Sequence, residues 1–385
     1  MAVYLDNAAS TPMRPEAVEA MLPFLSEHAA NPSGSHGASR AAKTALEQAR
    51  EDVARAAGAA PSEIVFTGSG SESDNLAIKG AAHAALEHDA ARNGVVTTGI
   101  EHKAVLASVK RLGMEGAQVG IVGAQASGVV DLDALADALD ERTAVVSVML
   151  VNNETGIVQP LDDVAALVRE RAPHAVLHTD AVQAPQWLDL REACAPADLV
   201  SISGHKFGGP KGVGVLLVRG GVRLVPLIEG GGHERELRAG TQNVAGIVAL
   251  AAALRVTDER RDKETARIRA LRDRLERGLN AVISGLAPTS DAERRVPGLL
   301  HASIDGVEAE TLLVALDQLG VYAASGSACS SGAIDPSHVL LAMGMTRERA
   351  LSCVRFSFGY ASTTDDVEEA VALIPDAVAK LRAAS

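Results

Sequence analysis

Aromatic residues and cysteines are scarce in this chain of 385 residues, and no apolar run is long enough to span a bilayer. Aromatics make up only 2% of the residues, so a flat ligand would have to stack on another planar side chain, such as a histidine. The three cysteines, Cys194, Cys329 and Cys353, are too few and too scattered for a disulfide framework or a zinc site. Their odd number and the lack of a signal peptide predict a reducing, cytoplasmic compartment and no bound metal.

Basic residues are also fewer than acidic ones, with 36 Lys and Arg against 49 Asp and Glu, so the formal net charge is −13. Proteins that bind nucleic acid directly present a basic face, so this balance argues against a nucleic-acid partner. Hydrophobic residues make up 47% of the chain, which is enough for a sizeable core. The composition therefore indicates a folded protein with neither a membrane span nor a nucleic-acid surface.

What the sequence does contain is a regular alternation of apolar, β-branched runs with helical segments. Strands are expected at residues 64–67, 95–98, 119–122, 144–150, 176–180, 198–200 and 213–218. This pattern is typical of the α/β class, with a mostly parallel sheet covered by helices on both faces. After about Val244 a long helix rich in Ala, Arg and Glu runs to about Val282, and a smaller α+β part follows.

Polar residues follow several of these strands directly. Because ligands of such sheets bind at the carboxyl ends of the strands, we expect these side chains to lie on one rim. They are Ser71, His102, Asn153, Asp180 and Lys206.

Two of these stretches have a recognisable chemistry. Lys206 ends Ser203-Gly204-His205-Lys206, where a lysine beside a buried strand can lose its proton and attack a carbonyl; a solvated loop lysine is the alternative. Gly68-Ser69-Gly70-Ser71-Glu72 lies between a strand and a helix and could bind one phosphate or form an ordinary N-cap. It lacks the third glycine of a dinucleotide-binding fingerprint and the lysine of a P-loop.

Single residues elsewhere leave similar alternatives open. Asp180 could face a pyridinium nitrogen, as in pyridoxal phosphate enzymes, or cap the next segment, and Gln183 could reach the same ligand or face solvent. His102 could stack on a ring or be structural. Arg355 could hold a carboxylate or pair with a nearby acid. Cys329 could be reactive or an incidental surface thiol, whereas Cys194 and Cys353 are expected to be inert.

Taken together, these residues resemble the NifS-like group I cysteine desulfurases, which are fold-type I pyridoxal phosphate enzymes of the class V aminotransferase family. The resemblance extends over nearly the whole chain and rests on Ser203-Gly204-His205-Lys206, Ser325-Gly326-Ser327-Ala328-Cys329, and the glycine-rich stretch from Gly230 to Thr241. It implies a large domain with a mostly parallel seven-stranded sheet, at residues 15–255. Residues 1–14 and 256–385 would form a small α+β domain that carries the cysteine loop.

The resemblance also implies a role for each matching residue. Lys206 would bond covalently to pyridoxal 5'-phosphate, Asp180 would face its pyridine nitrogen, Gln183 its hydroxyl, and His102 would stack on its ring. The phosphate would be held by Gly70, Ser71, Ser203, His205 and, from the partner subunit of a homodimer, Thr241. Ser71 stands where family members often have Thr, so the hydroxyl is kept.

The implied reaction converts L-cysteine to L-alanine. Asn153 and Arg355 would orient the substrate, Lys206 and His102 would handle protons, and Cys329 would take the sulfur as a persulfide. The persulfide would pass to a sulfur-acceptor protein, such as an iron–sulfur scaffold or a thiolation enzyme.

Other readings remain open but are less favoured. A selenocysteine lyase is a close alternative. A class V aminotransferase needs no nucleophilic thiol, so the Cys329 loop argues against it. A non-catalytic sulfur carrier would not need Lys206 and Asp180, and a nicotinamide dehydrogenase would need the missing fingerprint.

Overall fold

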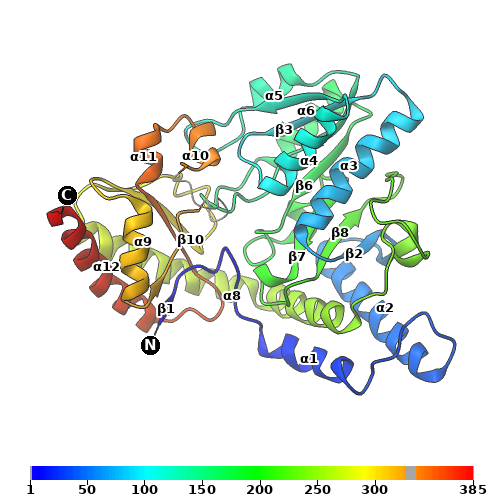
Figure 1. Cartoon of the computed structure of the whole chain (residues 1–385), viewed down its shortest axis with the longest axis horizontal. Coiled ribbons are helices and arrows are strands. Elements are labelled where there is room, and N and C mark those ends of the chain that lie inside the picture. Colours follow the sequence, from blue (N-terminus) through cyan, green and yellow to red (C-terminus); the bar gives the residue numbers. More distant parts are fainter. Residues whose placement is uncertain (1, 327–334, 385) are drawn as a thin grey trace.

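The structure is a computed structural model that describes residues 2–326 and 335–384, so Cys329 lies outside the described residues. Its centre is a seven-stranded sheet (Figure 1). The strands follow the order β2 (Ile64–Thr67), β8 (Gly214–Val218), β7 (Leu199–Ser203), β6 (Val176–Asp180), β5 (Thr143–Ser147), β3 (Gly94–Thr98) and β4 (Gln118–Val122). Strand β8 runs in the direction opposite to the other six strands. The predicted seven-stranded, mostly parallel sheet is therefore confirmed.

Helices cover both faces of this sheet because its strands are apolar on both sides. Val65, Val95 and Val145 face a cluster built with α3 (Gly70–His88) and α4 (Lys103–Met114). The adjacent residues Val96 and Val146 face the opposite cluster, which is built with α2 (Gly37–Ala57), α5 (Leu132–Ala138), α6 (Leu161–Arg171) and the first part of α8 (Val244–Val282). Successive strand residues point to opposite faces, so continuous runs of Val, Ile and Leu suit this arrangement.

A second, smaller part of the molecule contains an antiparallel sheet in the order β12 (Cys353–Ser357), β10 (Leu299–Ile304) and β9 (Leu286–Pro288). The N-terminal β1 (Val3–Tyr4) pairs with β11 (Val321–Tyr322) in the same region. Helices α9 (Ala309–Gln318), α10 (His338–Ala342), α11 (Arg347–Leu351) and α12 (Thr364–Ala384) complete it. The larger part also contains helices α1 (Pro15–Leu25) and α7 (Leu190–Ala193).

Helix α8 runs from one part of the molecule to the other (Figure 1). Its residues up to Leu254 pack in the core of the large sheet, and those from Ile268 onward pack in the core of the small one. The predicted boundary between residues 255 and 256 thus lies inside a continuous helix, and the division into domains stays a prediction.

Two expectations differ from the structure in detail. Sequence analysis named no helix after His102, but α4 begins there, and Val105, Val109 and Leu112 form its buried stripe. The predicted strand 144–150 extends beyond β5, which ends at Ser147. The backbone N–H groups of Val148 and Leu150 still donate to the carbonyls of His178 and Asp180, so pairing continues past the regular ladder. No helix in the described ranges is long and apolar enough to cross a membrane.

Candidate active site

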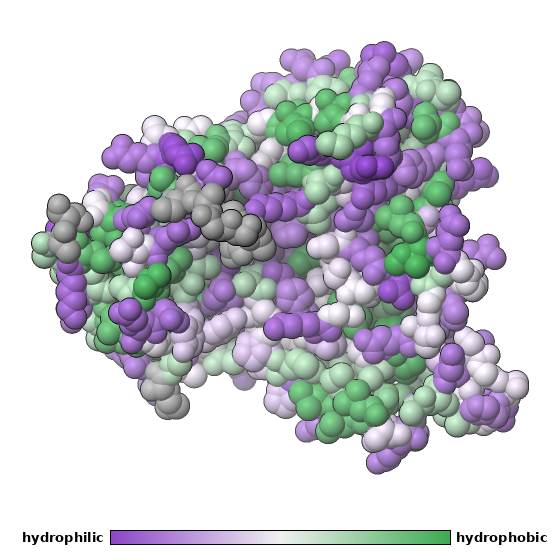
Figure 2. Space-filling view, viewed as in Figure 1, coloured by the Kyte–Doolittle hydropathy of each residue, from purple (hydrophilic) through white to green (hydrophobic). Residues whose placement is uncertain are grey.

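A cleft of about 360 Å³ opens at the carboxyl ends of the large-sheet strands, and residues of the small part form its other wall. Figure 2 shows the hollow between the two parts of the molecule, with many hydrophilic residues around it. The predicted site residues that line it are Gly70, Ser71, His102, Asn153, Asp180, Gln183, Ser203, His205, Lys206 and Arg355. Thr241 is exposed and is not among the described residues that line this cleft.

Lys206 enters the cleft from the turn Gly204–Lys206 that follows β7. Its Nζ donates hydrogen bonds to the backbone carbonyls of Ala8, at 2.7 Å, and Ala9, at 3.0 Å. Gln183 Nε2 also donates to the Ala8 carbonyl, at 2.8 Å. The N-terminal segment therefore forms one wall of the site, and two of its carbonyl groups orient the lysine amine.

The start of α3 offers the most suitable place for a phosphate. A Cβ atom at Gly70 would lie 2.8 Å from Val182 Cγ2 and 3.2 Å from Ser203 Cβ, so the close approach of helix and strand requires glycine. The first N–H groups of a helix have no partner within it and attract anions. Burial, together with nearby Lys206 and Lys211, lowers the pKa of His205 to about 4, so this side chain is neutral at pH 7.

Glu72 fixes the turn that precedes α3. One carboxylate oxygen accepts the backbone N–H of Gly68 at 2.8 Å, and the other accepts Arg238 Nε at 2.9 Å. Arg238 belongs to the glycine-rich stretch that ends in Thr241. Arg238 therefore ties the stretch from residue 230 to 241 to the turn before α3 in its own chain.

Asp180 ends β6 and is buried. Its Oδ1 accepts the backbone N–H of Val182 at 2.9 Å. Burial raises the pKa of this carboxyl group, and the nearby His102 and Lys206 act in the opposite direction. A buried carboxylate needs a donor or cationic partner, and the protonated nitrogen of a pyridine ring is such a partner. The site therefore fits pyridoxal phosphate.

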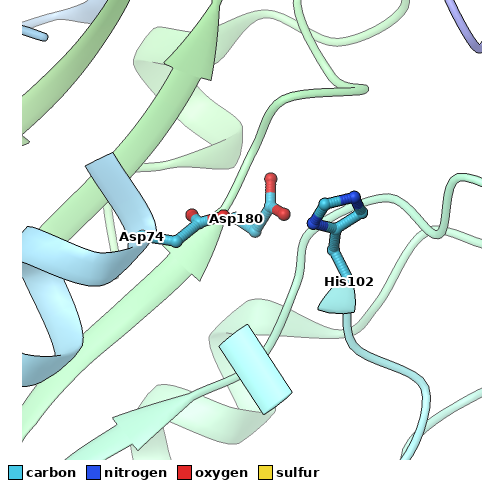
Figure 3. Close-up of side chains that lie close together, drawn as sticks. All are labelled: Asp74, His102 and Asp180. Carbon is cyan, nitrogen blue, oxygen red and sulfur yellow. The ribbon is translucent and has the colours of Figure 1, made fainter. Parts of the chain in front are cut away.

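His102 caps α4, where its Nδ1 accepts the backbone N–H of Ala104 at 3.2 Å. Because Nδ1 accepts, the neutral ring carries its proton on Nε2. Burial is the main cause that lowers the pKa of His102, although part of the ring is exposed. Figure 3 shows the side chains of Asp74, Asp180 and His102 directed toward one another, and their polar atoms all lie within 4.8 Å.

Arg355 on β12 is only 2% exposed. Its Nη2 donates to Asp6 Oδ1 at 2.7 Å, and its Nη1 donates to the backbone carbonyl of Asn153 at 2.8 Å. Arg355 therefore pairs with an acid and also lines the cleft, and its binding of a substrate carboxylate stays a prediction. The two contacts fix the guanidinium group in a position where it can meet a substrate carboxylate.

Several lining residues were not assigned a role by sequence analysis. They are Asp74, Lys103, Glu154 and His338. Asp74 lies one helical turn after Gly70, so the period of α3 could have placed it on the same face. His338 lies far from the other motifs in sequence, and only the fold brings its Nε2 to within 2.9 Å of the Glu101 carbonyl.

Two of the three cysteines lie among the described residues, and both are buried. Burial raises the pKa of Cys194 and of Cys353 to about 12. Neither thiol ionises near neutral pH, so neither is suited to nucleophilic attack. The assignment of Cys329 stays a prediction, because this residue is not described.

Comparison with known proteins agrees with this geometry. Residues 3–370 match the family described as aminotransferase class V. A cysteine desulfurase of Gluconacetobacter diazotrophicus is 44% identical over 99% of this chain and 94% of its own length. An IscS-like cysteine desulfurase of Mycobacterium tuberculosis is 42% identical over 99% of this chain and 98% of its own.

Solved structures show the same fold. A NifS-like protein superposes with a TM-score of 0.92 at 36% identity, over 99% of this chain and all of its own. A structure of SspA in complex with cysteine has a TM-score of 0.81 at 34% identity, over 94% of this chain and 99% of its own. The chain belongs to the class V aminotransferase family and, within it, to the cysteine desulfurases.

Proposed function

We propose that this protein takes sulfur from L-cysteine, releases L-alanine and holds the sulfur on Cys329 as a persulfide. The carbon–sulfur bond of the substrate breaks and a sulfur–sulfur bond forms at Cys329. The protons of the substrate and of the Cys329 thiol are redistributed between alanine and the persulfide, so no external oxidant is needed. The observation that carries this proposal is the meeting of Lys206, Asp180 and Arg355 in one cleft.

Pyridoxal phosphate, when bound, supplies an electron sink that stabilises negative charge at the substrate Cα. Lys206 would hold it covalently, Asp180 and Gln183 would contact its ring, and His102 would stack on the ring. Gly70, Ser71, Ser203 and His205 would hold its phosphate. The close fit at Gly70 and the buried carboxylate of Asp180 support this assignment.

The side chains of this chain then have separate tasks. Arg355, fixed by Asp6, would bind the substrate carboxylate, and Asn153 would orient the substrate beside it. The Lys206 amine, as a base near the substrate, would take the Cα proton. His102 carries a proton on Nε2 in its neutral form and is available for transfer of a second proton.

Sulfur transfer requires a thiol that can ionise. Cys194 and Cys353 are buried with raised pKa values, which supports the assignment of Cys329 as the nucleophile. From Cys329 the sulfur would pass to an acceptor protein in the cytoplasm, such as an iron–sulfur scaffold or a thiolation enzyme.

A homodimer would give Thr241 a function. Thr241 is exposed and does not line the described part of its own cleft, although Arg238 anchors the same stretch to Glu72. This arrangement supports the proposal that Thr241 contacts the phosphate in the partner's site.

The test is to incubate purified protein with pyridoxal phosphate, L-cysteine and a thiol reductant, and to measure alanine and sulfide together. The proposal predicts equal amounts of both products. Sulfide with pyruvate and ammonia in place of alanine would contradict it.

A further inference from the structure

Two carboxyl groups besides Asp180 are buried beside the cleft, and no proposed step uses them. Asp74 on α3 is 1% exposed, and Glu101, just before α4, is 0% exposed. Three negative charges so close together in a buried region would repel strongly, so their protonation states matter for whatever binds at Asp180. The contacts of each group indicate which form it takes.

The hydrogen bonds of Glu101 are all on one side of its carboxyl group. Oε1 accepts the Thr98 hydroxyl at 2.7 Å and the Met149 backbone N–H at 2.8 Å. Oε2 is buried and has no hydrogen-bond partner within residues 2–326 and 335–384. An unpartnered buried oxygen costs far more in a carboxylate, which spreads its charge over both oxygens, than in a carboxylic acid, whose O–H group on that oxygen is uncharged. The pattern fits the neutral acid.

Asp74 likewise has no ionic partner that would stabilise a charge. Its Oδ1 is buried without a hydrogen bond to any described atom. Nε2 of His178 lies 3.6 Å from this oxygen. This imidazole lies between two hydroxyl groups, with Ser147 Oγ 2.8 Å from Nδ1 and Ser201 Oγ 3.0 Å from Nε2. Burial lowers the pKa of His178 to about 3, so the ring is neutral and offers no positive charge.

The charged groups around the three carboxyls are distributed unevenly. Burial raises the pKa of Asp180, but His102 and Lys206 oppose this effect and favour its ionised form. Burial also raises the pKa of Asp74, well above the usual range, and Asp180 and Glu101 add to this effect, whereas a hydrogen bond with Ser201 acts in the opposite direction. Burial raises the pKa of Glu101 to about 8, and Asp180 adds to this effect. The other titratable side chains that line the same cleft are Lys103, Glu154, His205, His338 and Arg355.

From this arrangement we infer that Asp74 and Glu101 are neutral carboxylic acids at neutral pH, which leaves Asp180 as the carboxylate of these three and the one that would face the pyridine nitrogen of the cofactor. Polar atoms of Asp74 and Asp180 lie within 4.8 Å of each other (Figure 3). Two carboxyls at such a distance compete for one proton. Lys206 and the backbone N–H of Val182 favour the ionised form of Asp180 and leave that proton on Asp74. Asp74 and Glu101 therefore act as positioning residues that keep the charge of Asp180 in place.

The protonation states rest on contacts within this chain alone, and only their consequence for the cofactor rests on the proposed function. They can be read directly from infrared difference spectra of the holoenzyme, because a carboxylic acid has a carbonyl stretch at higher frequency than a carboxylate. We expect Asp74→Asn and Glu101→Gln each to remove one band of a neutral acid from the spectrum at pH 7. Loss of carboxylate bands instead would overturn the inference, whether or not the protein releases sulfide.

The affinity of each variant for pyridoxal phosphate provides a second, independent test. The amide variants imitate a neutral acid in shape and polarity, so Asp74→Asn and Glu101→Gln should hold pyridoxal phosphate within about threefold of the wild-type affinity and keep its visible absorption maximum. Asp180→Asn, the matched change at the carboxylate, should weaken binding at least about 100-fold or shift the maximum. If Asp74→Asn proved as damaging as Asp180→Asn, Asp74 would be a carboxylate and the inference would be wrong.

Discussion

Arg355 and Asp6 are 349 positions apart in sequence, and their side chains are joined by a hydrogen bond of 2.7 Å between Nη2 and Oδ1. Arg355 lies on a strand of the small sheet, and Asp6 follows the first strand of the chain. The pair therefore ties the N-terminal segment, whose Ala8 and Ala9 carbonyls hold Lys206, to the residue proposed to bind the substrate carboxylate.

Removing the carboxylate of Asp6 should loosen Arg355 and weaken substrate binding. A hydrogen bond between charged groups contributes about 1.5–3 kcal/mol, so we expect Asp6→Ala to raise KM for L-cysteine about tenfold or more, with a smaller effect on kcat. Asp6→Asn keeps a hydrogen-bond acceptor, so its KM for L-cysteine should lie between the values of the wild type and Asp6→Ala. KM and kcat can be measured from steady-state rates of sulfide release at several concentrations of L-cysteine. An unchanged KM in Asp6→Ala would show that Asp6 does not position Arg355.

Replacing Lys206 should remove the covalent bond to the cofactor but not all cofactor binding. The phosphate contacts and Asp180 remain in Lys206→Ala, so pyridoxal phosphate should still bind, reversibly and more weakly. Borohydride reduction followed by mass spectrometry should find the cofactor on Lys206 of the wild type and on no residue of the variant. A reducible cofactor–lysine bond at wild-type occupancy in the variant would refute the assignment.

Glu72 should control cofactor affinity without touching the cofactor ring. Glu72→Ala removes the acceptor of both Gly68 N–H and Arg238, so the phosphate-binding turn loses two hydrogen bonds. At about 1 kcal/mol each, the expected result is a roughly tenfold or greater loss of affinity for pyridoxal phosphate. Glu115→Ala is a suitable control, because Glu115 pairs with Arg111 on the surface. Equal cofactor affinity of the two variants, measured by absorbance titration, would argue against this role.

The raised pKa of Glu101 also predicts how stability depends on pH. Its pKa is about 8 in the folded protein against an ordinary value of 4.5, so between these values the folded state binds more protons than the unfolded state. The free energy of unfolding should therefore fall as pH rises through this range, by up to about 1.4 kcal/mol per pH unit from this group. Glu101→Gln should flatten the decline, which denaturant unfolding at several pH values would detect. An identical slope in both proteins would show that Glu101 is already ionised.

Local patterns in the sequence predict most of the large sheet and several residues of the candidate site. The β-branched runs before Asp180 and Lys206 identify buried strands, and the residues that follow such strands fall on one rim in any parallel sheet. Helix α4 (Lys103–Met114) was not predicted, although Val105, Val109 and Leu112 recur at helical spacing after its N-cap, His102.

The remaining features depend on distant contacts that no local pattern reveals. The pairing of Arg355 with Asp6 and the approach of His338 to Glu101 both arise only when the small part folds against the large sheet. Asp74 looks like an ordinary polar residue of a helix until its unpaired buried oxygen is seen. Patterns of neighbouring residues cannot predict whether a side chain is buried in an apolar environment when distant segments of the chain form that environment.

The identity of the sulfur carrier is the central claim, and mapping the sulfur after a single turnover tests it most directly. The buried thiols of Cys194 and Cys353, with pKa values of about 12, should stay unmodified when the holoenzyme reacts with L-cysteine in the absence of reductant. Digestion and mass spectrometry should locate one added sulfur on Cys329, and Cys329→Ser should still bind the cofactor but release sulfide several orders of magnitude more slowly. An added sulfur on Cys194 or Cys353, or near-normal sulfide release by Cys329→Ser, would contradict the mechanism.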